Sequence, residues 1–400
     1  MQSGPPTASA PPASSGRSGR CMRLEADVSL PPLPPRRYCD QAATSWPKPP
    51  EVLAAWHRAA SELGVAAGRG GYREAVEAAS VLDAARQVWS RLLGGVSSAR
   101  IAMPATATLG LNIAIHGLVQ QGDHVIATAA DHNATLRPLA WRARRGAVEM
   151  TVVPCDRQGR VDPDEVARSW RPTTRLVVLS HASNVTGTVQ DAAAILQIAR
   201  DRGGLLVLDA AQTAGTVPLA AEQLADVIVA PAHKWLLAPH GNACLWCREG
   251  VEPEPLVQGG TGLLSDTLEM PEAFAARHEA GTPDLAAAAG LVAAEQWWQS
   301  PAAACERQHA TGSRLAEACR EQLESIAGVR VVAGEGGPPI VSFLVEHYAP
   351  AEVAAALEVA AGVQVRSGFH CAAEVHRWLG TPEGTVRASF GPFNSSDDVQ

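Results

Sequence analysis

Six short apolar segments alternate with helical stretches along the middle of this 400-residue chain. The segments are residues 124–128, 148–153, 175–180, 205–208, 226–229 and 243–246. Helical periodicity lies between several of them, for example at residues 191–202. The alternation predicts crossover units, and therefore an α/β fold with a mainly parallel sheet and helices on both faces. In such sheets, ligands bind at the carboxyl ends of the strands.

Polar residues follow three of these segments directly. Asn184 comes after the third segment, Asp209 after the fourth and Lys234 after the fifth. Lys234 is informative because arginine outnumbers lysine 31 to 2 in the chain, Lys48 being the other lysine. Arginine cannot form an imine through a neutral amine, so a lysine retained against this bias is a candidate for that chemistry.

Asp209 and Lys234 lie 25 residues apart, each after a predicted buried strand. A pyridoxal phosphate enzyme needs a lysine that forms an imine and an aspartate that keeps the pyridine nitrogen protonated, because only then is the ring an electron sink. The carboxylate does this best at low dielectric. The pair therefore favours a site for pyridoxal 5'-phosphate, with His233 as a donor to the phosphate.

Longer motifs extend this pattern in chain order. The chain resembles the class V aminotransferase family of fold type I at residues 40–45 (DQAATS), 181–188 (HASNVTGT), 208–215 (LDAAQTAG) and 232–241 (AHKWLLAPHG). Residues 366–372 (RSGFHCA) and 384–391 (GTVRASFG) look like its cysteine desulfurase branch. The resemblance runs from about residue 38 to the C-terminus.

The resemblance implies a large domain with a seven-stranded, mainly parallel sheet between helices, and a smaller α+β C-terminal domain. We expect the large domain at residues 36–285 and the small domain, which carries the Cys371 loop, at residues 286–400. Ala-rich stretches within 286–294, 313–323 and 351–360 are expected to be helices of the small domain. Pro, Ser and Gly dominate residues 1–35, which we expect to be a disordered tail.

The resemblance also implies roles for individual residues. Lys234 would carry the cofactor and move a proton, Asp209 would pair with the pyridine nitrogen, and His132 would stack on the ring. Asn184 and Gln212 would hydrogen-bond near the ring oxygen. The phosphate would be bound by Thr108, which opens a predicted helix, by His233, and by Thr282 of a neighbouring subunit, which implies a homodimer.

The same resemblance assigns the substrate contacts. Arg387, with Arg366 as a second candidate, would bind the carboxylate of L-cysteine or a related amino acid, and Asn184 would also contact the substrate. The Cys371 thiolate would take the sulfur as a persulfide, leaving alanine, and nearby His370 and Arg366 would favour the thiolate. An acceptor protein or small thiol would then receive the sulfur.

Three departures keep alternatives open. Pro231 stands where the family has a hydroxyl residue, Leu109 where it commonly has Glu, and Ala238 where it usually has Gly. Another class V reaction, such as that of a C–S lyase, an epimerase or an aminotransferase, would not need Cys371. A non-catalytic relative that scaffolds sulfur transfer is the remaining alternative.

Composition narrows the partners and the compartment. A net charge of -8 gives no broad cationic surface for nucleic acid or anionic membrane, and no apolar run approaches the ~20 residues of a membrane span. Eight dispersed cysteines fit reduced thiols in a cytoplasmic protein. We expect no metal site: Cys244 and Cys247 form a single CxxC on a predicted strand, where residues i and i+3 point to opposite faces.

Overall fold

The computed structural model describes residues 35–263, 266–300, 305–332, 334 and 336–400, and for residues 305–310 the backbone only. The predicted tail at residues 1–35 lies outside the described residues, apart from Pro35, so it stays a prediction. Among the helices described, none combines the length and the apolar character needed to cross a bilayer.

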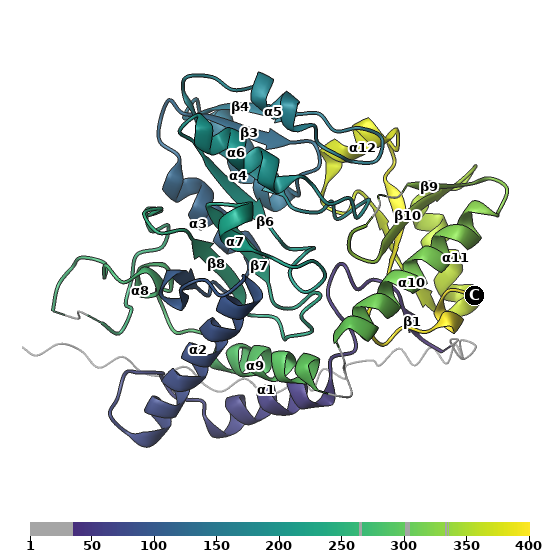
Figure 1. Cartoon of the computed structure of the whole chain (residues 1–400). Coiled ribbons are helices and arrows are strands. Elements are labelled where there is room, and N and C mark those ends of the chain that lie inside the picture. Colours follow the sequence, from purple (N-terminus) through teal and green to yellow (C-terminus); the bar gives the residue numbers. More distant parts are fainter. Residues whose placement is uncertain (1–34, 264–265, 301–304, 333, 335) are drawn as a thin grey trace, which may run out of the picture. The chain divides into compact units, whose positions relative to one another are not determined.

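A seven-stranded sheet forms the centre of the described chain (Figure 1). Its strand order is β2 (Ile101–Ala102), β8 (Ala243–Cys247), β7 (Val227–Pro231), β6 (Leu205–Asp209), β5 (Thr174–Ser180), β3 (His124–Thr128) and β4 (Glu149–Val153). Only β8 runs antiparallel to its neighbours within this described sheet. The six predicted strands and the α/β fold are confirmed. The two residues of β2 are too few for a strand period to be visible in the sequence.

Helices cover both faces of this sheet, and successive strand residues enter separate cores. The core on one face includes residues of α1 (Pro50–Glu62), α2 (Arg73–Leu92), α5 (Pro163–Arg168), α6 (Ala192–Asp201), α7 (Ala221–Leu224) and α9 (Leu285–Gln299). The core on the other face includes residues of α3 (Ala107–Leu118), α4 (Asn133–Arg144) and α8 (Phe274–His278). Cys244 lies in the first core and Cys247 in the second, as the strand period predicted.

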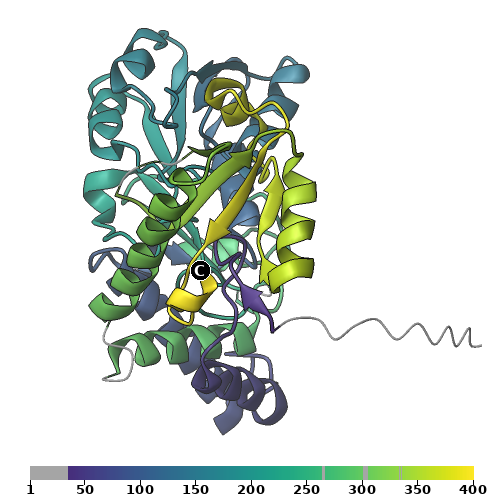
Figure 2. The same ribbon diagram turned by 90° about the vertical axis from the view of Figure 1, so that its right-hand side faces the viewer.

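A smaller antiparallel sheet follows toward the C-terminus (Figure 2). Its order is β12 (Arg366–Gly368), β13 (Thr385–Ser389), β10 (Ile340–Val345) and β9 (Val329–Val332). The helices of this part are α10 (Cys305–Glu324), α11 (Pro350–Ala361) and α12 (Ala373–Leu379). Both α10 and α11 contact the small sheet. The expected smaller α+β part is therefore present.

The N-terminal segment connects the small sheet to the loop of Lys234. Strand β1 (Arg37–Tyr38) pairs in parallel with β11 (Val363–Gln364). Seven residues after Tyr38, the backbone N–H of Ser45 donates to the carbonyl oxygen of His233 at 3.1 Å. The segment of residues 37–45 therefore joins the C-terminal part of the described chain to the loop that carries Lys234.

The expectation for α9 was wrong in one respect. We predicted this helix as part of the C-terminal domain, but it packs against α1 and α2 and its Leu285 and Leu291 join the core of the large sheet. The physical reason is its composition: a helix rich in alanine, leucine and tryptophan is apolar nearly all round, so its sequence does not indicate which surface it covers. The contacts of α9 therefore do not support a domain boundary at residue 285, and the division of the chain into domains stays a prediction.

A buried ion-pair cluster at the start of β7 gives a stability prediction. The Asp226 carboxylate accepts from Arg200 Nη2 at 3.0 Å, from Arg248 Nε at 2.8 Å and from the backbone N–H of Leu206 at 3.0 Å. Asp226→Ala will lower the free energy of unfolding by about 3 kcal/mol, because two guanidinium groups and a buried amide lose their acceptor. Urea denaturation measures this, with the exposed Asp201→Ala as a control that changes little. If Asp226→Ala lowers the free energy of unfolding no more than Asp201→Ala does, the stabilising role of Asp226 is wrong.

Candidate active site

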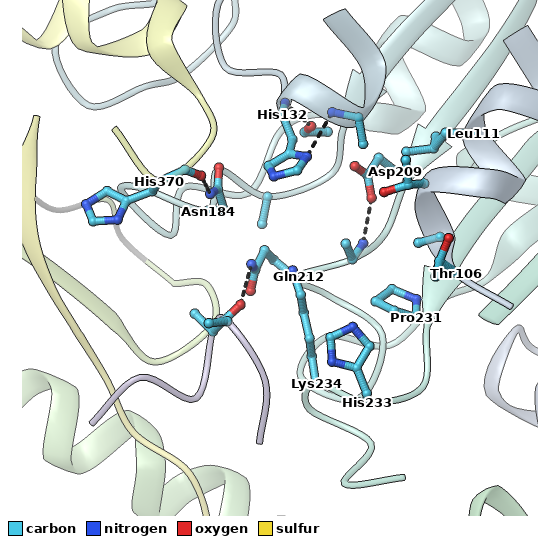
Figure 3. Close-up of a pocket in the computed structure, with 18 of the residues that line it drawn as sticks. Thr106, Leu111, His132, Asn184, Asp209, Gln212, Pro231, His233, Lys234 and His370 are labelled. Carbon is cyan, nitrogen blue, oxygen red and sulfur yellow. Dashed lines mark hydrogen bonds between the residues drawn. The ribbon is translucent and has the colours of Figure 1, made fainter. Parts of the chain in front are cut away.

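A cavity of about 270 Å³ lies at the carboxyl ends of β5, β6 and β7, where the strand order predicted a ligand site (Figure 3). The helix starts of α3 and α4, residues 42–43 and the small sheet complete its walls. The predicted site residues that line it are Thr108, His132, Asn184, Asp209, Gln212, His233, Lys234, Arg366 and Arg387. Cys371 and Thr282 are not among its lining residues.

Lys234 and Asp209 face the same cavity from neighbouring strand ends (Figure 3). Asp209 is the last residue of β6, and its Oδ1 accepts from the backbone N–H of Ala211 at 2.9 Å. Burial raises the pKa of Asp209. Burial also lowers the pKa of Lys234 from 10.5 to about 8, and the negative charge of Asp209 opposes this shift. The site therefore holds a lysine that is partly a neutral amine near neutral pH.

This lowered pKa gives a measurable titration. Below pH 8 the Lys234 amine is protonated and unreactive, and above pH 8 it is neutral. Competitive acetylation of the cofactor-free protein, followed by peptide mass spectrometry, will show a midpoint for Lys234 near pH 8. Asp209→Asn will move the midpoint lower, since removing the carboxylate removes the interaction that favours the ammonium form. A midpoint near the ordinary lysine value of about 10.4 would contradict the described environment.

His132 forms the wall opposite Lys234 in the close-up view (Figure 3). It is the N-cap residue of α4, and its Nδ1 accepts from the backbone N–H of Ala134 at 3.0 Å. Burial, with nearby cations, lowers the pKa of His132 to about 4. The ring is thus neutral, with its proton on Nε2, and is held in orientation by the helix it caps.

The start of α3 differs from the prediction by one residue. Thr108 does not open the helix: α3 begins at Ala107, and Thr106 is the N-cap, its hydroxyl accepting from Leu109 N at 3.1 Å. Both threonines line the cavity. A threonine directly before a helical run is an N-cap signal, so Thr106 was recognisable from the sequence. The first backbone N–H groups of a helix lack partners within it, which makes this end suited to an anion.

Two amide side chains in the wall of the cavity, Gln212 and Asn184, are held by hydrogen bonds to the protein. Gln212 Nε2 donates to Ala42 O at 3.1 Å, and its Oε1 accepts from Trp235 Nε1 at 2.9 Å. Asn184 Nδ2 donates to His370 O at 2.6 Å, while its buried Oδ1 has no hydrogen-bond partner among the described residues. Both amides are therefore oriented by the protein before any ligand binds.

The two predicted carboxylate-binding arginines have different environments. Arg387 is almost fully buried; its Nη2 donates to Asp40 Oδ1 and its Nη1 to Asn184 O, both at 2.8 Å. Its buried Nε has no partner among the described residues. Arg366 is half-buried, and its Nη2 lies 3.5 Å from Cys371 Sγ. Asp40, which the sequence analysis did not assign a role, is thus the counterion of Arg387.

Cys371 lies on a tight loop after β12. His370 and Cys371 have φ values of 50° and 59°, and the backbone N–H of Asn133 donates to Cys371 O at 2.7 Å. The expectation that His370 would favour the thiolate was wrong. Its Nε2 bonds to Thr385 O at 3.1 Å and burial lowers its pKa to about 2, so the ring carries no charge near Cys371. Arg366 is the cation that lies near the exposed thiol.

Lys48 contacts the backbone next to Lys234. Its Nζ donates to Ser45 Oγ at 2.8 Å, to Ser45 O at 3.1 Å and to His233 O at 3.3 Å. The His233 ring stacks on His240, with centroids 4.7 Å apart, and its Nδ1 lies 3.0 Å from Thr44 Oγ1. The second lysine of the chain therefore fixes the loop that carries the first.

The family model for the aminotransferases of class V matches residues 37–400. The chain belongs to the class V aminotransferase family. A relative named probable cysteine desulfurase, from Methanothermobacter thermautotrophicus, is 34% identical over 95% of this chain and 96% of its own length. Another of the same name, from Pseudomonas putida, is 32% identical over 91% of each chain.

Solved structures of similar proteins confirm the fold of this member of the class V aminotransferase family. The apo cysteine desulfurase of Thermococcus onnurineus matches with a TM-score of 0.82 and 29% identity, over 90% of this chain and 91% of that one. The cysteine desulfurase CsdA of Escherichia coli matches with a TM-score of 0.81 and 27% identity, over 91% and 92%. Fold type I, predicted from the motifs, is thereby confirmed.

Proposed function

We propose that this member of the class V aminotransferase family is a pyridoxal phosphate-dependent cysteine desulfurase. It would convert L-cysteine to L-alanine and retain the sulfur on Cys371. One observation carries the choice among class V reactions. The thiol of Cys371 is exposed, and the Arg366 guanidinium lies 3.5 Å from its sulfur. The loop that carries Cys371 also carries His370, which lines the cavity of Lys234. The desulfurase names and titles of the similar proteins support the same choice.

The cavity residues fit pyridoxal 5'-phosphate. A lysine with a lowered pKa and a buried aspartate share the cavity, and the buried Asn184 Oδ1 is without a partner among the described residues. Lys234 would hold the cofactor covalently, Asp209 its pyridine nitrogen, and His132 its ring face. The N-terminal turn of α3, with Thr106 and Thr108, and His233 would hold the phosphate. When bound, the cofactor supplies an electron sink for the substrate.

The protein groups then divide the work of the reaction. Arg387, with Arg366 as the second candidate, binds the substrate carboxylate, and Lys234 moves the proton between substrate carbons. The Cys371 thiolate attacks the substrate sulfur, so that a sulfur–sulfur bond forms as the carbon–sulfur bond breaks; the β-carbon keeps the electron pair of the broken bond and is protonated. The products are alanine and a persulfide on Cys371, which accounts for every atom of the cysteine.

The assembly and compartment are parts of the same proposal. Thr282 is exposed and does not line the cavity of its own chain, which suits a residue that completes the phosphate site of a second subunit in a homodimer. The six cysteines whose state the structure describes are free thiols, which supports a reducing cytoplasm. An acceptor protein or small thiol would remove the persulfide sulfur.

The experiment is turnover of L-cysteine by the purified protein with pyridoxal phosphate and a thiol reductant. Wild type will release alanine and sulfide in equal amounts, and Cys371→Ser will release neither from L-cysteine. The exposed Glu383→Gln serves as the control variant. Alanine without sulfide, or turnover that survives Cys371→Ser, would indicate another class V reaction. A protein that binds no pyridoxal phosphate would indicate a non-catalytic scaffold.

A further inference from the structure

A second hollow adjoins the thiol of Cys371. It has a volume of about 470 Å³ and is formed mainly by the facing sides of α3 and α4, with Cys371 in its wall. It shares Thr108, His132 and Ala134 with the Lys234 cavity, so the two spaces are neighbours. The mechanism proposed above gives this hollow no role.

The wall of this hollow is cationic. Arg137 is exposed in it and forms no ion pair with any residue that the structure describes. Arg366 adds a guanidinium close to the Cys371 sulfur. None of the described residues lining the hollow is Asp or Glu. Its histidines, His116 and His132, have lowered pKa values and are neutral, so Arg137 sets the charge of the lining residues.

An indole provides the apolar part of the same wall. Trp141 is 46% exposed; its ring makes a T-shaped contact with His116, at a centroid distance of 5.8 Å, and the guanidinium of Arg145 lies over it at 3.9 Å. An oriented aromatic surface beside an unpaired arginine can contact both a short carbon chain and an anionic group.

We propose that this hollow binds the sulfur acceptor, and that the acceptor is a small thiol carrying a carboxylate or sulfonate group. The proposal rests on the proposed function, because it needs a persulfide on Cys371. The volume falls in the range of small-molecule sites, and the cationic wall complements an anion. Arg137 would bind the anionic group while Trp141 contacts the carbon chain.

The transfer requires no further reactant. The acceptor thiolate attacks the outer sulfur of the Cys371 persulfide, and a new sulfur–sulfur bond forms. The old bond breaks with its electron pair on Cys371 Sγ, which returns to the thiolate. The outer sulfur keeps its proton and leaves as the acceptor persulfide. Arg366, near Cys371 Sγ, stabilises the thiolate that is released.

The test compares thiols of similar size and different charge as acceptors for the holoenzyme. The probes are 3-mercaptopropionate and 2-mercaptoethanesulfonate as anions, and 2-mercaptoethanol as the neutral thiol. Arg137→Ala will lower kcat/KM for the anions by about tenfold, as expected for losing a hydrogen bond to a charged group, and leave the neutral thiol unchanged. For each thiol, kcat/KM of the variant is divided by kcat/KM of wild type, so the intrinsic reactivity of the thiol cancels. Arg144→Ala, an exposed arginine on the same helix, is the matched control.

Two readouts separate this proposal from the proposed function. The amount of alanine released in a first turnover without acceptor will be the same in Arg137→Ala and in wild type. If wild type releases no alanine, the desulfurase function and this proposal are both overturned. Independently of turnover, Arg137→Ala will slow alkylation of Cys371 by iodoacetate relative to iodoacetamide. If Arg137→Ala affects anionic and neutral reagents equally, or no more than Arg144→Ala does, the anionic acceptor site is wrong while the desulfurase function stands.

Discussion

Replacing Lys234 with alanine will reduce alanine formation from L-cysteine by at least about 10³-fold, within the range of losing a catalytic proton-transfer group and more if covalent binding is also lost. The other lysine of the chain will not replace Lys234 in this role. The second lysine of the chain, Lys48, is bonded to Ser45 and to the carbonyl of His233 and does not line the cavity. The variant will also lack the visible absorbance of lysine-bound cofactor after dialysis with pyridoxal phosphate.

Lys234→Arg is the informative companion to this variant. It keeps a positive charge in the cavity, but its guanidinium stays protonated, so it will be as inactive as Lys234→Ala. Unchanged thermal unfolding of both variants without cofactor will show that the fold is intact. A folded variant that keeps turnover and visible absorbance would contradict the assignment of Lys234.

Substituting Asp209 with asparagine will lower kcat/KM for L-cysteine by about 10²- to 10³-fold, in the range found for losing one preorganised electrostatic contact. The side chains have the same shape, so the change isolates the negative charge. Asp209 is buried beside the cavity and has the Ala211 N–H as its backbone donor, and asparagine can keep that contact.

The control for Asp209 is Asp201→Asn, on the exposed end of α6, which will leave turnover unchanged. Binding of pyridoxal phosphate to Asp209→Asn, followed by fluorescence, will be weaker than to wild type. Wild-type turnover in Asp209→Asn would mean that the carboxylate does not hold the pyridine nitrogen.

The positions of Lys234 and Asp209 were predictable because parallel strands end at one edge of a sheet. Once β6 and β7 were recognised from their apolar runs, residues following them had to lie close together. The same argument brought Asn184 to the site from the end of β5. The fold class followed from the alternation of strands and helices, which requires no knowledge of distant contacts.

Contacts between distant parts of the chain were not predictable in this way. Arg387 pairs with Asp40 across 347 positions, and Asn133 donates to the carbonyl of Cys371. Neither contact leaves a periodic signal in the sequence. The neutral state of His370 likewise depends on its burial and on Thr385, which only the three-dimensional structure supplies. Of the two groups near Cys371 in sequence, Arg366 therefore lies beside the thiol as a cation, whereas His370 does not carry a charge.

The most direct test of the central claim is the mass of the Cys371 peptide after the holoenzyme reacts with one equivalent of L-cysteine in the absence of an acceptor thiol. We predict one added sulfur atom on Cys371, in an amount equal to the alanine released, and its removal by a reductant. Alanine released while Cys371 stays unmodified would contradict the account.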